Sequence, residues 1–222
     1  REGIGDIAAE GVVGVGEEFE KQDIAVHVNG LSPPAYDPRG VKGMGLGFYT
    51  STRGACHLRS DCDGIEISGG KTPNEDGKWM EMQGSRFHTE NKEYIPWREN
   101  YITLHDTLGS CKLTGRSVYN PDLMSKMVNA YLGTNFVAKD MMKIGERIYN
   151  LERLYNLKQK PEIIDKIHVP KQFTEPSNNL DGERMTEGEV KKMLADYYIT
   201  RGWNEKGIPK EDKLSELDIE EY

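Results

Sequence analysis

A long run of apolar side chains at helical spacing limits the folds open to this chain more than any other pattern in it. The run lies in the second half of the chain, and its members are Val137, Met141, Ile144, Ile148, Leu151 and Tyr155. Side chains three and four positions apart share one face of an α-helix, so the run predicts a long amphipathic helix. We therefore expect a fold that is organised by helix packing.

Signals for helix ends indicate two more helices. Asn120 is a favourable N-cap residue, and Pro121 directly after it suits the first helical turn. Thr186 and Glu189 have the spacing of a capping box, which opens a helix that ends near Gly202. Each of these signals acts through the nearby backbone, so the prediction needs no knowledge of the tertiary structure.

The first half of the chain has weaker patterns. Residues 97–108 repeat the helical spacing, and Gly109 marks the expected end of that helix. Residues 1–22 also have an apolar helical face, and the glycines on it predict close packing against a neighbour. Alternation over residues 24–31 predicts a short strand or an extended segment.

Two segments between these elements are rich in glycine. Residues 43–47 have glycine at every second position, so a helix there requires another part of the chain close to its backbone. Residues 60–92 are rich in Gly, Asp, Asn and Lys and are expected to form one long loop, a feature that is often functional. The expected fold is mainly α, an irregular helical domain with long loops and little or no sheet.

Composition excludes several classes of function. The chain has 222 residues and a formal net charge of −8, without the basic stripe that nucleic-acid binding requires. No run approaches the roughly 18 apolar residues of a membrane span. The three cysteines are too few and too scattered for a disulfide framework, which favours a reducing compartment and a cytoplasmic location.

A histidine in residues 53–59 is the first candidate for chemistry. His57 follows a glycine-rich segment, and Arg59 lies two residues further on. One interpretation is a structural histidine at a helix end. The other is a catalytic or metal-adjacent histidine, because imidazole titrates near neutral pH and the glycines let a cofactor approach the backbone.

Zinc is a third interpretation of the same region. Cys56, His57 and Cys62 are all potential zinc ligands. Their spacing matches no standard structural zinc site, and ligands on adjacent residues are geometrically awkward. We therefore do not favour a zinc site here.

The second candidate site follows the helix over residues 97–108, where the sequence reads Asp106-Thr107-Leu108-Gly109-Ser110-Cys111-Lys112. One interpretation is a helix that ends at glycine, followed by a buried thiol. The other is a thiolate ligand at an irregular turn, where the free amides of residues 109–112 hydrogen-bond a sulfur or an anionic cofactor. Cys111 alone cannot hold an iron–sulfur cluster, which needs three more ligands from elsewhere.

Several segments together resemble the aldehyde:ferredoxin oxidoreductases. They occur in the family's order and spread over nearly the whole chain, at residues 35–46, 50–57, 145–156, 193–198, 201–203 and 207–209. The resemblance implies that residues 1–30 end a preceding helical cofactor-binding domain. Residues 31–222 would form a C-terminal helical domain that contributes to the pterin and cluster site.

The resemblance also implies a cofactor. Members of this family bind tungsten, or sometimes molybdenum, through two pterins, and a nearby [4Fe–4S] cluster passes electrons to ferredoxin. By match to the family's second pterin loop, Asp106 hydrogen-bonds a pterin and Cys111 is the fourth cluster ligand. Gly109, Ser110 and Lys112 belong to the same cofactor-binding loop. His57 matches the active-site histidine, and Arg59 falls where a basic residue reaches the pterin.

The implied function is oxidation of an aldehyde to a carboxylic acid, with a ferredoxin-type acceptor or an iron–sulfur electron-transfer subunit. The family's three-cysteine cluster motif and first pterin loop are absent, so we expect this chain to need an N-terminal portion of the same protein and to be inactive alone. The alternatives are a tungsten subunit of a low-potential reductase, of the aromatic acyl-CoA type, and a non-catalytic helical module. A homodimer is left open.

Overall fold

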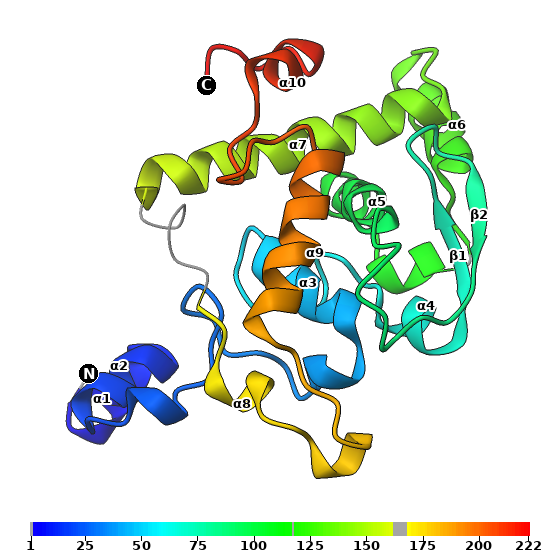
Figure 1. Ribbon diagram of the computed structural model, residues 1–222. Helices are drawn as coiled ribbons and strands as arrows, with labels where there is room; N and C mark the ends of the chain where they lie inside the picture. The colour runs from blue at the N-terminus through cyan, green and yellow to red at the C-terminus, as the bar shows by residue number, and fades with distance from the viewer. Residues whose placement is uncertain (1, 117, 162–167) are drawn as a thin grey trace.

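The computed structural model describes residues 2–116, 118–161 and 168–222, and these form a mainly helical fold (Figure 1). Its α-helices are α1 (Ile4–Ala9), α2 (Gly11–Glu18), α3 (Lys42–Thr50), α4 (Asp63–Ser68), α5 (Tyr94–Leu108), α6 (Pro121–Leu132), α7 (Ala138–Gln159), α8 (Lys171–Thr174), α9 (Glu187–Thr200) and α10 (Glu211–Glu216). Strands β1 (Gly70–Pro73) and β2 (Trp79–Met82) pair in antiparallel register. The predicted fold class is confirmed, with one hairpin as the sheet among these residues.

The helix-end signals are confirmed at both sites. The Asn120 side chain accepts a hydrogen bond from the amide of Leu123 at 2.7 Å and caps α6. Thr186 and Glu189 form the reciprocal capping box of α9, with a Glu189 amide to Thr186 hydroxyl distance of 3.2 Å. Each bond satisfies an amide that has no partner inside its own helix.

The two longest helices, α5 and α7, cross in close contact. A side chain at Gly145 of α7 would overlap the carbonyl oxygen of Asn100 on α5. The predicted long helix is confirmed, but its buried face differs from the predicted stripe: Val137 and Tyr155 are exposed, whereas Tyr149 is fully buried. The buried face is set by this glycine contact and by polar pairing rather than by hydrophobicity alone.

A polar cluster at the centre of the fold joins α3, α5 and α9. Glu99 is fully buried; its carboxylate accepts from Thr50 Oγ1 at 2.8 Å and from Arg201 Nη2 at 2.7 Å. Arg201 Nε also donates to Tyr197 Oη at 2.9 Å. Buried charges require this kind of pairing, because an unpaired charge in the interior is strongly destabilising.

The glycine-rich helix α3 is confirmed to lie against other chain segments. A side chain at Gly43 would overlap the Glu66 carboxylate, and one at Gly47 would overlap the Ser60 hydroxyl. The amide of Gly43 donates to Glu66 Oε2 at 2.7 Å, and Tyr94 Oη donates to Glu66 Oε1 at 2.8 Å. The absence of side chains at these positions therefore lets a buried carboxylate sit against the helix backbone.

The prediction of one long loop over residues 60–92 is wrong, because this segment contains α4 and the β1–β2 hairpin. The turn between the strands includes Gly77 at a φ of +78°, and the Gly77 amide donates to Asn74 O at 3.0 Å. An Asp-Gly pair between two short strands is a typical hairpin signal.

The N-terminal predictions also need correction. The predicted helix over residues 1–22 is two helices in the described part, which begins at residue 2, and Gly11, at a φ of +77°, is the first residue of the second. None of their apolar side chains is fully buried, and among their described glycines only Gly16 makes the expected close approach to another segment, at Ala25. Residues 24–31 form no strand; Val28 and Leu31 make an isolated bridge after a short 3-10 helix, Gln22–Ile24.

Helices α1 and α2 lie at one corner of the molecule, on the opposite side from α6 and the hairpin (Figure 1). The proposed boundary near residue 30 stays a prediction. In the described parts of the chain, no helix has the length and apolar content to cross a bilayer.

Candidate functional site

The turn that ends α5 carries the second candidate motif. Gly109 closes the helix in the left-handed conformation, at a φ of +65°, which glycine adopts without strain. Its amide donates to Asp106 O at 3.3 Å, and the Ser110 amide donates to His105 O at 2.9 Å. The expectation of four free amides over residues 109–112 is therefore wrong for these two, because the helix end uses them.

Asp106, the first residue of this motif, lies between two cations. Its Oδ2 atom is 3.0 Å from Arg59 Nη1 and 2.8 Å from Lys112 Nζ. Lys112 also donates to the carbonyl oxygen of Leu58 at 3.3 Å. These contacts bring the turn after α5 against the segment that carries the first candidate motif.

Glu152, on α7, binds the opposite side of Arg59. Its Oε2 atom accepts from Arg59 Nη2 and from Thr52 Oγ1, the latter at 2.6 Å. The guanidinium carbon of Arg59 also lies 5.4 Å from the centre of the Tyr149 ring, within range of a cation–π interaction.

We call Arg59, Asp106, Lys112 and Glu152 the Arg59 cluster. Its two cations and two carboxylates have formal charges that cancel, which suits the burial of Arg59, whose side chain is 5% exposed. The Nε atom of Arg59 is buried and has no hydrogen-bond partner among the described residues. The cluster therefore holds three chain segments together and leaves one donor of Arg59 unused.

The segment before Arg59 is fixed by Gly54. This residue has a φ of +94°, and a side chain there would overlap the carbonyl oxygen of Val28. The next amide, of Ala55, donates to that same oxygen at 3.3 Å. Only glycine combines this conformation with this approach, so the Val28–Leu31 bridge and Gly54 together set the path of the chain into His57.

His57 is half-buried beside an aromatic ring. Its ring centre lies 5.1 Å from that of Tyr36, at an angle of 48°. The preceding residue, Cys56, accepts from Arg53 Nη2 at 3.1 Å. The imidazole is therefore packed on one side and remains partly accessible on the other.

The structure brings Arg59, Asp106 and Lys112 into direct contact. His57 and Cys111 lie one or two residues away from those contacts, but no hydrogen bond or ring contact joins them within the described residues. The thiol of Cys111 is exposed and free. The predicted residues thus share one region, and their roles remain predictions.

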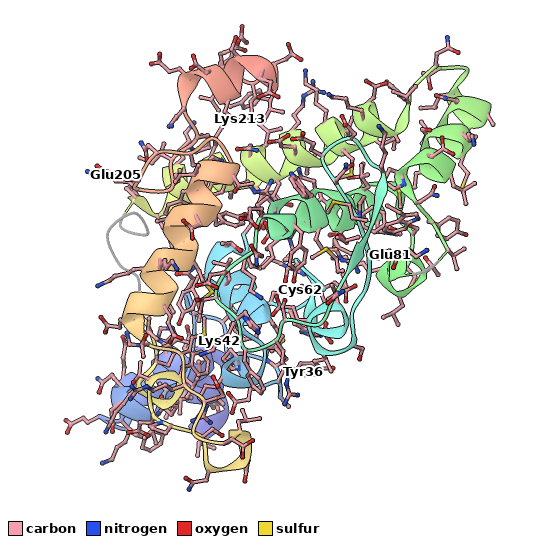
Figure 2. The ribbon with its side chains drawn as sticks, turned by 45° about the vertical axis from the view of Figure 1, so that its right-hand side comes forward. Tyr36, Lys42, Cys62, Glu81, Glu205 and Lys213 are labelled. Carbon is pink, nitrogen blue, oxygen red and sulfur yellow. The ribbon has the colours of Figure 1, made fainter. Side chains whose placement is uncertain are left out.

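Cys62, the third potential zinc ligand, is buried, whereas Cys56 and His57 are partly exposed. It is 1% exposed, lies in the interior (Figure 2), and is 3.5 Å from Ser60 Oγ. Burial also raises the pKa of its thiol, which opposes the thiolate form that binds metal. Across the described ranges, no three His, Cys, Asp or Glu side chains converge in a way that could hold a metal ion.

Sequence reasoning missed Glu152 and its neighbours on α7. Tyr149 Oη donates to Thr50 O at 3.0 Å, and Asn156 Nδ2 donates to Thr52 O at 2.6 Å. Tyr149, Glu152 and Asn156 are spaced three and four residues apart, so they share one helix face. That polar row within residues 145–156 is the signal that could have identified α7 as the support of the site.

His105, directly before Asp106 in the chain, is buried. Its Nδ1 atom lies 2.7 Å from Ser110 Oγ, while Nε2 has no partner in the described structure. Burial, with a smaller contribution from the nearby Arg98 cation, lowers the pKa of His105 to about 4. The imidazole is therefore neutral at physiological pH, and its contact with Ser110 supports the turn after α5.

Comparison with known proteins matches this chain over its length. The family model for aldehyde ferredoxin oxidoreductase, domains 2 & 3, matches residues 1–219. The tungsten-containing aldehyde ferredoxin oxidoreductase of Pyrococcus horikoshii is 36% identical over 229 residues, and that of Pyrococcus furiosus is 36% identical over 230. Each alignment covers 100% of this chain and 35% of the relative.

The helical fold and these matches define the class of this chain, a helical region of an oxidoreductase family. The chain belongs to the aldehyde ferredoxin oxidoreductase family and corresponds to domains 2 and 3 of its members. It spans about a third of the length of the relatives it matches.

A solved structure with a similar fold is the active site complex BamBC of benzoyl coenzyme A reductase in complex with 1,5 dienoyl-CoA. The TM-score is 0.66, and the match covers 100% of this chain and 37% of that one. At 18% sequence identity, this likeness shows the fold alone.

Proposed function

We propose that this chain is part of a tungsten or molybdenum bis-pterin, iron–sulfur oxidoreductase that oxidises an aldehyde to a carboxylic acid and passes the electrons to a ferredoxin-type acceptor. The observation that carries the proposal is the Asp106–Cys111 turn, held against Arg59 in a chain 36% identical to tungsten-containing aldehyde ferredoxin oxidoreductases over its full length. Because the chain covers 35% of those relatives, the activity belongs to the longer protein.

The residues at this turn have the donor chemistry that the cofactors require. The exposed thiol of Cys111 can ligate a cluster iron as the thiolate. The carboxylate of Asp106 can accept hydrogen bonds from the amine groups of a pterin, and the unused Nε donor of Arg59 can serve an acceptor on it. Gly109, Ser110 and Lys112 would shape the same loop, with Lys112 neutralising Asp106.

When bound, the cofactors supply the redox chemistry, and the protein binds and orients the reactants. His57 would orient the carbonyl of the substrate or carry a proton at an imidazole nitrogen, a role that its partly accessible ring allows. Gly54 and the Arg59 cluster would keep that ring in place. A displacement of about 1 Å at such a group is enough to slow a reaction by about a hundredfold.

The experiment is metal analysis and assay of the full-length protein. We expect tungsten or molybdenum, about four irons per chain, and oxidation of simple aldehydes with a low-potential electron acceptor. Metal with reduction of an aromatic thioester, and without aldehyde oxidation, would indicate the reductase alternative. A colourless, metal-free protein of native length would indicate a non-catalytic module and would overturn the proposal.

A further inference from the structure

An apolar groove lies between the end of α5 and α6. It has a volume of about 360 Å³. Its lining includes Leu108, Tyr119, Met124, Met127, Tyr131 and Leu132. We call this the α6 groove. Helix α6 lies at one edge of the molecule (Figure 1), and several lining side chains are exposed, so the groove is at the surface.

One face of α6 is apolar along its length but is buried only at its start. Met124, Met127 and Tyr131 are three and four residues apart, so they share this face. Met124 is buried against the core, whereas Met127 is 51% exposed, Tyr131 is 88% exposed and Leu132 is 60% exposed. An apolar helix face that continues, exposed, beyond its contact with the core indicates a surface that another polypeptide covers.

The groove is continuous with the candidate cofactor turn. Leu108 and Ser110 line the groove, and Cys111 follows directly in the chain. Beyond Cys111, Leu113 is 62% exposed and Val118 is 58% exposed, so the apolar surface extends past the thiol. Any polypeptide that approaches Cys111 from this side therefore meets the groove as well.

We propose that the α6 groove is covered by the remaining part of the family protein, which this chain does not include. The relatives are almost three times as long as the matched region, so ample polypeptide lies outside it. The choice of occupant rests on the proposed function. A four-iron cluster at Cys111 needs three more ligands, and the protein segment that supplies them must pack within a few ångströms of that thiol.

The chemistry of the groove favours a permanent partner over a dissociating one. Permanent interfaces resemble a domain core that has been divided in two, whereas transient ones are more polar. The groove is lined mainly by aliphatic and aromatic side chains, and the Asp122–Lys126 pair of α6 lies on another face of that helix. A ferredoxin-type acceptor that binds and leaves would need a more polar surface.

The first test is cysteine labelling in the full-length protein. Met127→Cys places a thiol in the groove, and Lys126→Cys places one on the adjacent face, where the lysine side chain is 69% exposed. We expect Met127→Cys to react with a maleimide at least about tenfold more slowly than Lys126→Cys in the native protein, and at an equal rate in denaturant. Equal rates in the native protein would overturn the proposal.

The second test identifies the occupant. A photo-crosslinking amino acid at Tyr131 of the full-length protein should form a cross-link within its own chain, to a segment upstream of the region described here. Mixed light and heavy isotope-labelled chains separate this result from a cross-link between two copies. A cross-link to a second copy, or one that forms only when an electron acceptor is added, would contradict the proposal.

The two proposals fail separately. If Met127→Cys is protected in a protein that contains neither tungsten, molybdenum nor iron, the covered groove stands and the proposed function fails. If the metals are present and Met127→Cys reacts freely, the proposed function stands and the covered groove fails. Circular dichroism of both variants checks that each has folded.

Discussion

At the scale of single residues, the site depends on how Arg59 is neutralised. Its buried guanidinium bonds one carboxylate on α5 and one on α7, while Lys112 shares Asp106. The sequence could suggest Asp106 and Cys111 as candidate site residues because they belong to one short motif. It could not identify Glu152 or Thr52 as their support, because that contact joins residues 100 positions apart.

Glu152→Gln should destabilise the protein while leaving its shape intact. The substitution keeps the size of the side chain but removes one of the two charges that balance Arg59. Because the Glu152 side chain is 38% exposed, solvent screens part of the loss, and we expect a decrease of about 1 to 2 kcal/mol in the free energy of unfolding. Thermal unfolding of the full-length protein, with and without the substitution, measures this decrease.

The matched control is Glu187→Gln on α9. Glu187 pairs with Lys191 at 3.7 Å, and both side chains are well exposed, so the same chemical change should cost less than about 0.5 kcal/mol. If both variants lost equal stability, the Arg59 cluster would have no special structural role.

His105 predicts a pH dependence. Its pKa in the folded protein is about 4, below the value of about 6.5 in an unfolded chain. Between these values the unfolded chain binds a proton that the folded one does not, so stability falls as the pH drops through this window.

Unfolding measured at pH 7.5 and pH 4.5 should show a His105 contribution of about 2 kcal/mol. This contribution should be absent in His105→Gln and retained in His88→Gln, since His88 is exposed. A pH profile that His105→Gln leaves unchanged would argue that this imidazole is not buried in its neutral form.

At the scale of elements, local sequence signals were sufficient to predict where helices end, but they did not predict how the elements pack together. Asn120, Thr186 and Gly109 marked real helix ends, because a cap bonds the nearest backbone groups. The hairpin was missed because strand β1, Gly70–Pro73, has a composition that disfavours strands. Its pairing with β2 and its packing against neighbouring helices override that preference.

Gly145→Ala tests the crossing of α5 and α7. Alanine favours a helix by about 1 kcal/mol over glycine, but its methyl group would overlap the Asn100 carbonyl. We expect overpacking to dominate and to lower the free energy of unfolding by about 1 to 3 kcal/mol.

Gly188→Ala in α9 is the opposite case, because little lies near that position. It should be neutral or stabilise the protein by up to about 1 kcal/mol. Chemical denaturation of the two variants side by side should therefore lower the midpoint for Gly145→Ala and leave it unchanged or raise it for Gly188→Ala. A stabilising Gly145→Ala would contradict the close crossing.

At the scale of the whole molecule, this chain is a helical region whose candidate site faces outward. The candidate cofactor turn, the Arg59 cluster and the α6 groove lie at or near its surface, and the relatives are longer than the matched region. Sequence predicted the helical class and the family. It did not reveal the groove, since residues 108 and 131 become neighbours only after α5 and α6 pack together.

The most direct measurement is the iron content of full-length protein that carries Cys111→Ala, beside Cys56→Ala as a control. We expect Cys111→Ala to lose most of its iron, together with the signal of the cluster in electron paramagnetic resonance. Cys56→Ala should keep both, since that thiol faces Arg53 rather than the turn after α5. An unchanged iron content in folded Cys111→Ala would contradict the assignment of this turn as the cluster site.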